Sequence, residues 1–316
     1  MSDLLNIVTR IVDNVASVFV GKRLIIERII LAFISGGHVL IEDVPGVGKT
    51  TLVHAVAKSL GCSFKRIQFT PDLLPSDITG ITVYNVKTGN FEFKEGPIMA
   101  NIILADEINR SSPKTQSSLL EAMQEGQITI DGITHKLPNP FIVLATQNPI
   151  EYEGTFPLPE AQLDRFSMRI SIGYPDCEEE KKILKLFGYE NPLNNLKSII
   201  TSVQIEMLRE EINKIYVDDK VEEYIISIIH ATRAHSDIYL GCSPRGTLTL
   251  YNTSRALAFI RGRDYVIPDD VKELVYPVLN HRLILKPDAK ISGKTTELIL
   301  KDILNSTRVP LVKNNV

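Results

Sequence analysis

The segment formed by residues 39–57 constrains the fold more than any other part of the chain. Its apolar start, residues 39–41, is followed by a glycine-containing loop, and residues 52–57 have helical spacing. A strand, a tight glycine loop and a helix opening with Lys-Thr are typical of a phosphate-binding loop. Backbone N–H groups and the helix N-terminus of such a loop attract phosphate oxygens. The strict pattern has glycine where this chain has Asp43, so a chance glycine-rich turn remains the alternative.

The loop defines a first set of candidate ligand-binding residues. Lys49 is expected to reach the β- and γ-phosphates of a nucleotide, and the Thr50 hydroxyl to ligate Mg²⁺. The predicted nucleotide-binding residues of the loop are Pro45, Gly46, Val47, Gly48, Lys49, Thr50 and Thr51.

A pair of carboxylates follows a second apolar strand, residues 102–105. Asp106 and Glu107 would be costly at the end of a buried strand without partners, and a bound Mg²⁺ would supply one. Asp106 is predicted to hold the metal and Glu107 to polarise an attacking water. The alternative is a solvated strand end, which the preceding phosphate loop makes less favoured.

Two further polar residues extend the predicted site. Asn148 follows the apolar strand 141–146, where it could orient the attacking water, although an Asn-Pro turn is the structural alternative. Arg165 ends a short predicted helix, residues 158–166. An arginine there suits the helix dipole, but it could also reach into a neighbouring subunit's nucleotide site.

Arg245 conflicts with the local rules for helix starts. Ser243 and Pro244 fit the N-cap and the first helical position, so Arg245 lies in the first turn, where the dipole disfavours a cation. We interpret it as a phosphate-binding residue contributed by the helical half of the chain.

The pattern of elements predicts two domains. Apolar strands alternating with helices over residues 1–175 indicate an α/β fold with a parallel sheet in an α/β/α sandwich, whereas residues 176–316 are predicted to be all-helical. Two hairpins are predicted inside the first domain, one in the insertion 70–97 and one at 127–137. Each could be surface decoration or could handle a client.

Composition excludes several classes of function. The net charge of −3 gives no global field that favours nucleic acid or an anionic membrane. The three cysteines lie far apart, which favours a reducing compartment over a zinc ribbon. No signal peptide or membrane span is predicted, so a cytoplasmic location is expected.

These residues resemble MoxR-type AAA+ ATPases over nearly the whole chain. The resemblance includes the loop with Asp43, the Asp106–Arg110 segment, the 119–125 helix, the 145–149 strand end and the Arg261–Tyr265 segment. It implies an ATPase core, an all-helical lid and a ring, commonly a hexamer. It also implies the following roles: Walker A for Lys49 and Thr50, Walker B for Asp106 and Glu107, sensor 1 for Asn148, arginine finger for Arg165, sensor 2 for Arg245, and a rival trans contributor in Arg110.

The main functional hypothesis is ATP hydrolysis that drives conformational work on a protein client. The resemblance implies a chaperone-like role in the maturation or assembly of protein complexes or in metal-cofactor insertion, with von Willebrand factor A partners. A nucleotide-gated scaffold with negligible turnover is a second hypothesis, against which Glu107 argues. A nucleic-acid motor and a magnesium-chelatase motor subunit are further alternatives.

Overall fold

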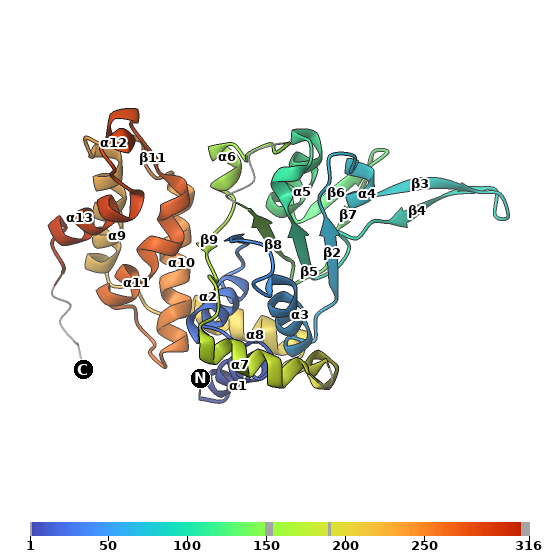
Figure 1. The fold of residues 1–316 in the computed structure, drawn as a ribbon, viewed down its shortest axis with the longest axis horizontal. Helices are drawn as coiled ribbons and strands as arrows, with labels where there is room; N and C mark the ends of the chain where they lie inside the picture. Colours follow the sequence, from blue (N-terminus) through green and yellow to red (C-terminus); the bar gives the residue numbers. More distant parts are fainter. Residues whose placement is uncertain (1, 149–153, 189–190, 311–316) are drawn as a thin grey trace.

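The fold is built on a parallel five-stranded sheet, as predicted (Figure 1). The computed structural model describes residues 2–148, 154–188 and 191–310. The strands, in spatial order, are β2 (Phe64–Gln68), β5 (Ile102–Asp106), β8 (Ile142–Gln147), β1 (Val39–Glu42) and β9 (Met168–Ile170). All their pairings are parallel, so the carboxyl ends of the strands share one edge.

Alternation along the buried strands divides the core into two layers. Ile41 and Leu104 face the helices α1 (Ser2–Ala16), α2 (Arg23–Ile34) and α3 (Lys49–Ser59), whereas Leu40 and Ile103 face α5 (Pro113–Glu125). Successive side chains of a strand point to opposite faces, which is why a strand buried on both sides is apolar throughout.

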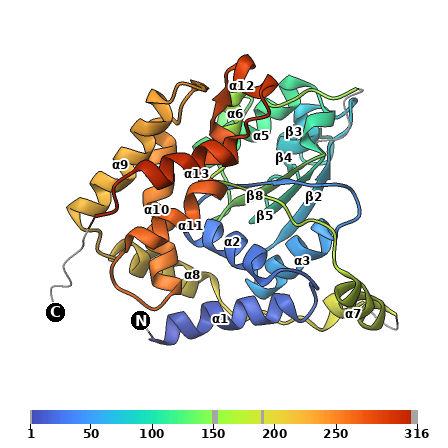
Figure 2. The same ribbon diagram turned by 60° about the vertical axis from the view of Figure 1, so that its left-hand side comes forward.

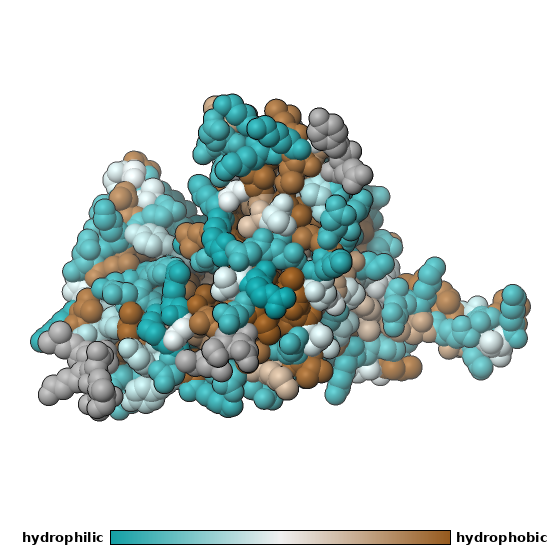
Figure 3. All heavy atoms as spheres, turned by 90° about the horizontal axis from the view of Figure 1, so that it is seen from below, coloured by the Kyte–Doolittle hydropathy of each residue, from teal (hydrophilic) through white to brown (hydrophobic). Residues whose placement is uncertain are grey.

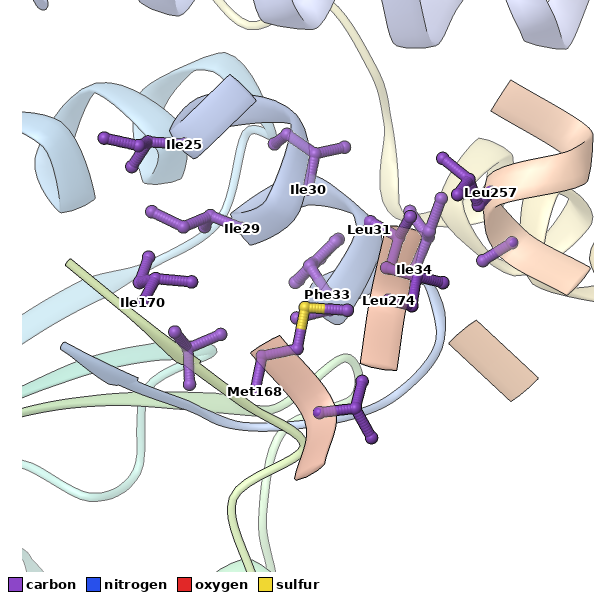
Figure 4. Packing of buried hydrophobic residues seen from close by; sticks show 14 of the residues in the cluster. Ile25, Ile29, Ile30, Leu31, Phe33, Ile34, Met168, Ile170, Leu257 and Leu274 are labelled. Atoms are coloured by element: carbon purple, nitrogen blue, oxygen red, sulfur yellow. The ribbon is translucent and has the colours of Figure 1, made fainter. Parts of the chain in front are cut away.

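Helix α2 joins the sheet to the C-terminal helices. Its residues 29–34 are all apolar and buried, whereas its charged residues, Arg23, Glu27 and Arg28, lie in the first half of the helix. Figure 4 shows Ile29 and Phe33 directed toward Met168 and Ile170 of β9, while Ile34 approaches Leu257 and Leu274. One continuous core therefore connects the two halves of the chain.

The C-terminal helices form a group beside the sheet (Figure 1). They are α9 (Asp219–Ala234), α10 (Pro244–Ile260), α11 (Pro268–Leu279), α12 (Pro287–Ile291) and α13 (Thr296–Ser306). The group also contains a short antiparallel pair, β10 (Ile238–Leu240) and β11 (Ile284–Leu285), that the sequence did not indicate.

The segment after β9 stays close to the first half of the chain. Helix α7 (Cys177–Phe187) lies at the same end of the molecule as α1 in both ribbon views (Figures 1 and 2), and α8 (Ser202–Asn213) contacts α2. The domain boundary at residue 175 stays a prediction. None of the helices in the described ranges combines the length and apolarity needed to cross a bilayer.

Both predicted hairpins are present. The pair β3 (Gly80–Asn85) and β4 (Asn90–Glu95) projects as an arm, and apolar side chains remain visible on it (Figures 1 and 3). The second pair is β6 (Gln127–Ile130) and β7 (Ile133–Lys136). Phe93 of the arm stacks on His135 of the second hairpin, with ring centroids 4.1 Å apart.

His38, which precedes β1, is a buried histidine held by two backbone groups. Its Nε2 lies 3.0 Å from the carbonyl oxygen of Met123, and its Nδ1 accepts the N–H of Val143 at 3.0 Å. The contacts fix a neutral ring with the proton on Nε2. Burial lowers the pKa of His38 to about 4.

The fold should therefore lose stability in mild acid through His38. Between its unfolded pKa of about 6.5 and its folded pKa of about 4, the unfolded state binds more protons, so stability falls as pH falls. Between pH 7 and pH 5 this loss amounts to about 2 kcal/mol. Urea unfolding at both pH values should give a flatter pH dependence for His38→Gln than for the native chain. An equal slope in the two proteins would contradict this assignment.

Candidate functional site

The loop between β1 and α3 has the backbone of a phosphate cradle. Gly46 and Gly48 have φ of 86° and 85°, a left-handed conformation that side chains disfavour, and both line a cavity of about 390 Å³. Helix α3 begins at Lys49, so its unpaired N–H groups face the same space. This arrangement suits a di- or triphosphate group.

Asp43 has a structural reason to replace glycine at the start of the loop. Glycine is not required there, because Asp43 does not have a positive φ. Its buried carboxylate accepts hydrogen bonds from the N–H of Gly173 at 2.8 Å and the hydroxyl of Ser171 at 3.2 Å, and from the N–H of Ile172. Asp43 therefore ties the loop to the chain leaving β9.

Lys49 lies at the base of the cavity. Its ammonium donates a 2.7 Å hydrogen bond to the carbonyl oxygen of Asp43, and Thr50 and Thr51 line the cavity beside it. Partial burial lowers the pKa of Lys49. The ammonium charge of Lys49 thus lies in the cavity, where a bound phosphate group would neutralise it.

The two predicted carboxylates, at the end of β5, line the same cavity as the loop. The Thr146 hydroxyl donates to Asp106 Oδ1 at 2.6 Å and accepts the N–H of Glu107 at 2.8 Å. Glu107 is left-handed, with φ of 55°, which costs a non-glycine residue roughly 1–2 kcal/mol. In this conformation Glu107 lines the cavity.

The side chains around these carboxylates include two residues that sequence reasoning missed. Arg66 pairs with Asp106 at 2.6 Å, and Gln68 donates to Glu107 Oε2 at 3.0 Å. Arg110, the rival trans residue, contacts Glu107 of its own chain at 3.1 Å. The alternation of β2 could have indicated that residues 66 and 68 share a face, but not which partners they meet.

Asn148 joins the same cavity, where it lies buried just beyond β8. The phosphate loop, Asp106, Glu107 and Asn148 are thus brought together from β1, β5 and β8, three adjacent strands. This is the shared edge at which parallel α/β sheets bind ligands.

The donor set fits Mg²⁺ bound together with a nucleotide. Thr50 and Asp106 both line the cavity, and their side chains offer hard oxygen ligands. Within the described ranges, no cluster of three or more His, Cys, Asp or Glu side chains could hold a metal by itself. Magnesium usually takes one or two protein ligands and completes its shell with phosphate oxygens and water.

A second cavity, of about 220 Å³, adjoins the first and shares Gly46, Gly48 and Thr51 with it. Its apolar lining includes Val18, Phe19, Val47, Ile172, Tyr174, Ile183 and Phe187. An apolar pocket next to a phosphate cradle suits a nucleotide base. The sequence did not predict it, because its walls come from three distant segments.

The other two arginines predicted to belong to the site, Arg165 and Arg245, lie away from the phosphate cavity. Arg165 and Arg245 line a third cavity, of about 270 Å³, together with Gly37 and His38 at the amino end of β1. Helix α6 (Glu160–Leu163) ends before Arg165, which is in the following turn. Neither arginine lines the cavities beside the phosphate loop, so the expected contact of Arg245 with its own chain's phosphate site is not formed.

Asp164 connects the turn that carries Arg165 to the helix start that carries Arg245. Its carboxylate accepts hydrogen bonds from the Ser243 hydroxyl at 3.0 and 2.9 Å and lies 3.6 Å from Arg245. It also pairs with Arg282, whose side chain is only 1% exposed. Ser243 is the N-cap of α10, as predicted. The turn with Arg165 and the helix start with Arg245 therefore form one rigid junction between the sheet and the C-terminal helices.

Comparison with known proteins agrees with this geometry. Residues 38–168 match the ATPase family associated with various cellular activities (AAA), and residues 230–303 match the AAA lid domain. A presumed ATPase from Cytophaga hutchinsonii has a solved structure that matches with a TM-score of 0.92 and 44% identity, covering 98% of this chain and 96% of that one.

Two relatives are similar over most of their length. The uncharacterised protein YeaC of Bacillus subtilis is 50% identical over 314 residues, 99% of this chain and 98% of its own. Chaperone MoxR1 of Mycobacterium tuberculosis is 42% identical over 312 residues, 96% of this chain and 82% of its own. With its phosphate loop, paired carboxylates and lid, the chain belongs to the MoxR family of AAA ATPases.

Proposed function

We propose that the protein binds ATP with Mg²⁺, hydrolyses it to ADP and phosphate, and uses the cycle to do conformational work on a protein client. The observation that carries this proposal is the meeting of the phosphate loop, Asp106, Glu107 and Asn148 in one cavity. Simple nucleotide binding would not require Glu107, which lines that cavity in a left-handed backbone conformation.

Each residue has a role that follows from its chemistry. The loop N–H groups and Lys49 bind the phosphates, and the apolar cavity holds the base. Thr50 and Asp106 would hold Mg²⁺, which neutralises phosphate charge when bound. Glu107 polarises the attacking water and takes its proton, while Asn148 orients that water.

The positions of Arg165 and Arg245 support hydrolysis in a ring. Both lie at the amino edge of the sheet, opposite the phosphate loop, so they cannot complete the site of their own chain as placed here. In a head-to-tail ring two different surfaces of the subunit meet, which allows this edge of one subunit to face the carboxyl edge of the next. We infer that both arginines act in trans in a homo-oligomer, with a hexamer as the expected size.

A protein client is supported by the exposed arm. Val86 is 85% exposed and Phe91 74%, although both are apolar. Exposed apolar groups on a projecting hairpin are typical of interaction sites. The name of the Mycobacterium tuberculosis relative is that of a chaperone. We therefore propose chaperone-like maturation or assembly of protein complexes, or metal-cofactor insertion, in the cytoplasm with a von Willebrand factor A partner.

Replacing Glu107 by glutamine should uncouple binding from turnover. Loss of a general base lowers turnover by about 10²-fold or more, whereas the phosphate cradle is untouched. Steady-state phosphate release and nucleotide affinity should be measured for Glu107→Gln beside Glu121→Gln, which alters an exposed carboxylate of α5. Native protein that releases phosphate no faster than buffer would instead favour the nucleotide-gated scaffold.

Mixing two inactive variants should restore activity if Arg165 acts in trans. Lys49→Ala loses its own nucleotide site but can still offer Arg165, and Arg165→Ala has the opposite defect. Random mixed rings then contain intact interfaces and should recover about a quarter of native turnover. Arg261→Ala, which changes an exposed arginine outside the three cavities, should stay active alone. A mixture as inactive as its components would place Arg165 in cis.

Client binding should depend on the arm. Glu107→Gln held with ATP should retain clients, and adding Phe91→Ser should reduce the retained amount because an apolar contact is lost. The readout is quantitative co-purification from the native cell extract. Equal recovery with and without Phe91→Ser would show that the arm is not the binding surface.

A further inference from the structure

Arg66 enters the phosphate cavity from β2, the edge strand next to β5. Its Nε and Nη2 donate to the same oxygen, Oδ2 of Asp106, at 3.1 and 2.6 Å. The other carboxylate oxygen, Oδ1, already accepts the hydroxyl of Thr146. Both oxygens of Asp106 are thus engaged by groups of the chain itself.

This arrangement has a consequence for Mg²⁺, because Asp106 is the carboxylate that would hold it. A carboxylate oxygen accepts about two contacts, so the two N–H groups of Arg66 occupy Oδ2, and Oδ1 keeps only the accepting position beside the Thr146 hydroxyl. Charge-assisted hydrogen bonds of this kind are the strong ones in proteins. Metal binding at Asp106 therefore has to compete with Arg66.

The geometry also indicates that Arg66 can leave. Its side chain is 46% exposed, whereas the buried Arg282 that pairs with Asp164 is 1% exposed. A half-exposed guanidinium regains water when it departs, so the cost of release is small. The side-chain amide of Gln68 accepts a hydrogen bond from Arg66 Nη2 and donates one to Glu107. When Arg66 leaves, Gln68 therefore loses one of the two contacts that hold it beside Glu107.

We propose that Arg66 is an internal counter-ion that holds Asp106 in the empty site and is displaced when the Mg²⁺–nucleotide complex binds. The proposal rests on the proposed ATPase function and adds a positioning residue to the same site. Arg66 lowers the affinity for the metal and keeps Asp106 oriented while the site is empty. It differs from a phosphate ligand, which would raise the affinity for the nucleotide.

The first test measures metal affinity directly. Mn²⁺, which can replace Mg²⁺ and is visible by electron paramagnetic resonance, is titrated into protein saturated with ADP. Removing the competitor in Arg66→Gln should tighten Mn²⁺ binding about three- to ten-fold. Affinity for ADP without metal should stay unchanged. Arg23→Gln, which breaks an exposed ion pair with Asp13, should leave both affinities unchanged.

A double-mutant cycle in nucleotide-free protein tests the contact between Arg66 and Asp106 itself. The Tm shifts of Arg66→Gln and Asp106→Asn should fail to add in the double variant by roughly 1–3 °C. Additive shifts would mean that Arg66 acts only by long-range repulsion, and the proposal would be wrong. Unchanged or weaker Mn²⁺ binding in Arg66→Gln would also overturn it, and weaker metal-free ADP binding would identify a phosphate ligand. Native protein without metal-dependent nucleotide binding would instead refute the proposed function.

Discussion

The candidate site at the carboxyl edge of the sheet depends on one buried hydroxyl group, that of Thr146. It is the donor for Asp106 and the acceptor for the backbone of Glu107, so one side chain of β8 orients the last residue of β5 and the residue that follows it. Without that acceptor, the left-handed backbone of Glu107 would lose its compensation. The parallel register, which places Ala105 beside Ala145, brings the hydroxyl to this position. The chemistry of the site is therefore set by strand pairing.

Two aspartates connect the sheet to what surrounds it, one at each edge. Asp43 holds the phosphate loop against the chain leaving β9, and Asp164 holds the C-terminal helices against the turn with Arg165. Both carboxylates are largely withdrawn from water and have several donors, which makes each of them a costly residue to replace. The loop and the arginine turn are thus rigidly placed on opposite sides of the same sheet.

Much of this could be predicted from the sequence, because the informative signals are local. Apolar strands ending in polar residues, Asp131-Gly132 between two strands, and Ser243 before Pro244 each specify a structure within a few residues. The fold class and the cavity with Glu107 followed from such signals. The resemblance to MoxR-type ATPases includes an aspartate at position 43 of the loop. The physical reason for that aspartate is its hydrogen bond with the N–H of Gly173, which only the structure shows.

What could not be predicted depends on distant residues. The apolar cavity combines Phe19 with Ile172 and Phe187, and no local pattern joins them. The placement of Arg245 follows from how α10 docks on Asp164, which is a tertiary contact. No local pattern marks Arg66, because its partner Asp106 is 40 residues away in the sequence.

The stacking of Phe93 on His135 has a mechanical consequence for the two hairpins. The arm is connected to β2 and β5, while the second hairpin is connected to α5 and β8. A force applied at the exposed tip near Val86 is consequently shared between the connections of both hairpins to the sheet, instead of bending the β3–β4 hairpin alone. Both hairpins are connected to strands that end at the cavity, so tension on the arm would be transmitted to the strands that position Asp106 and Asn148.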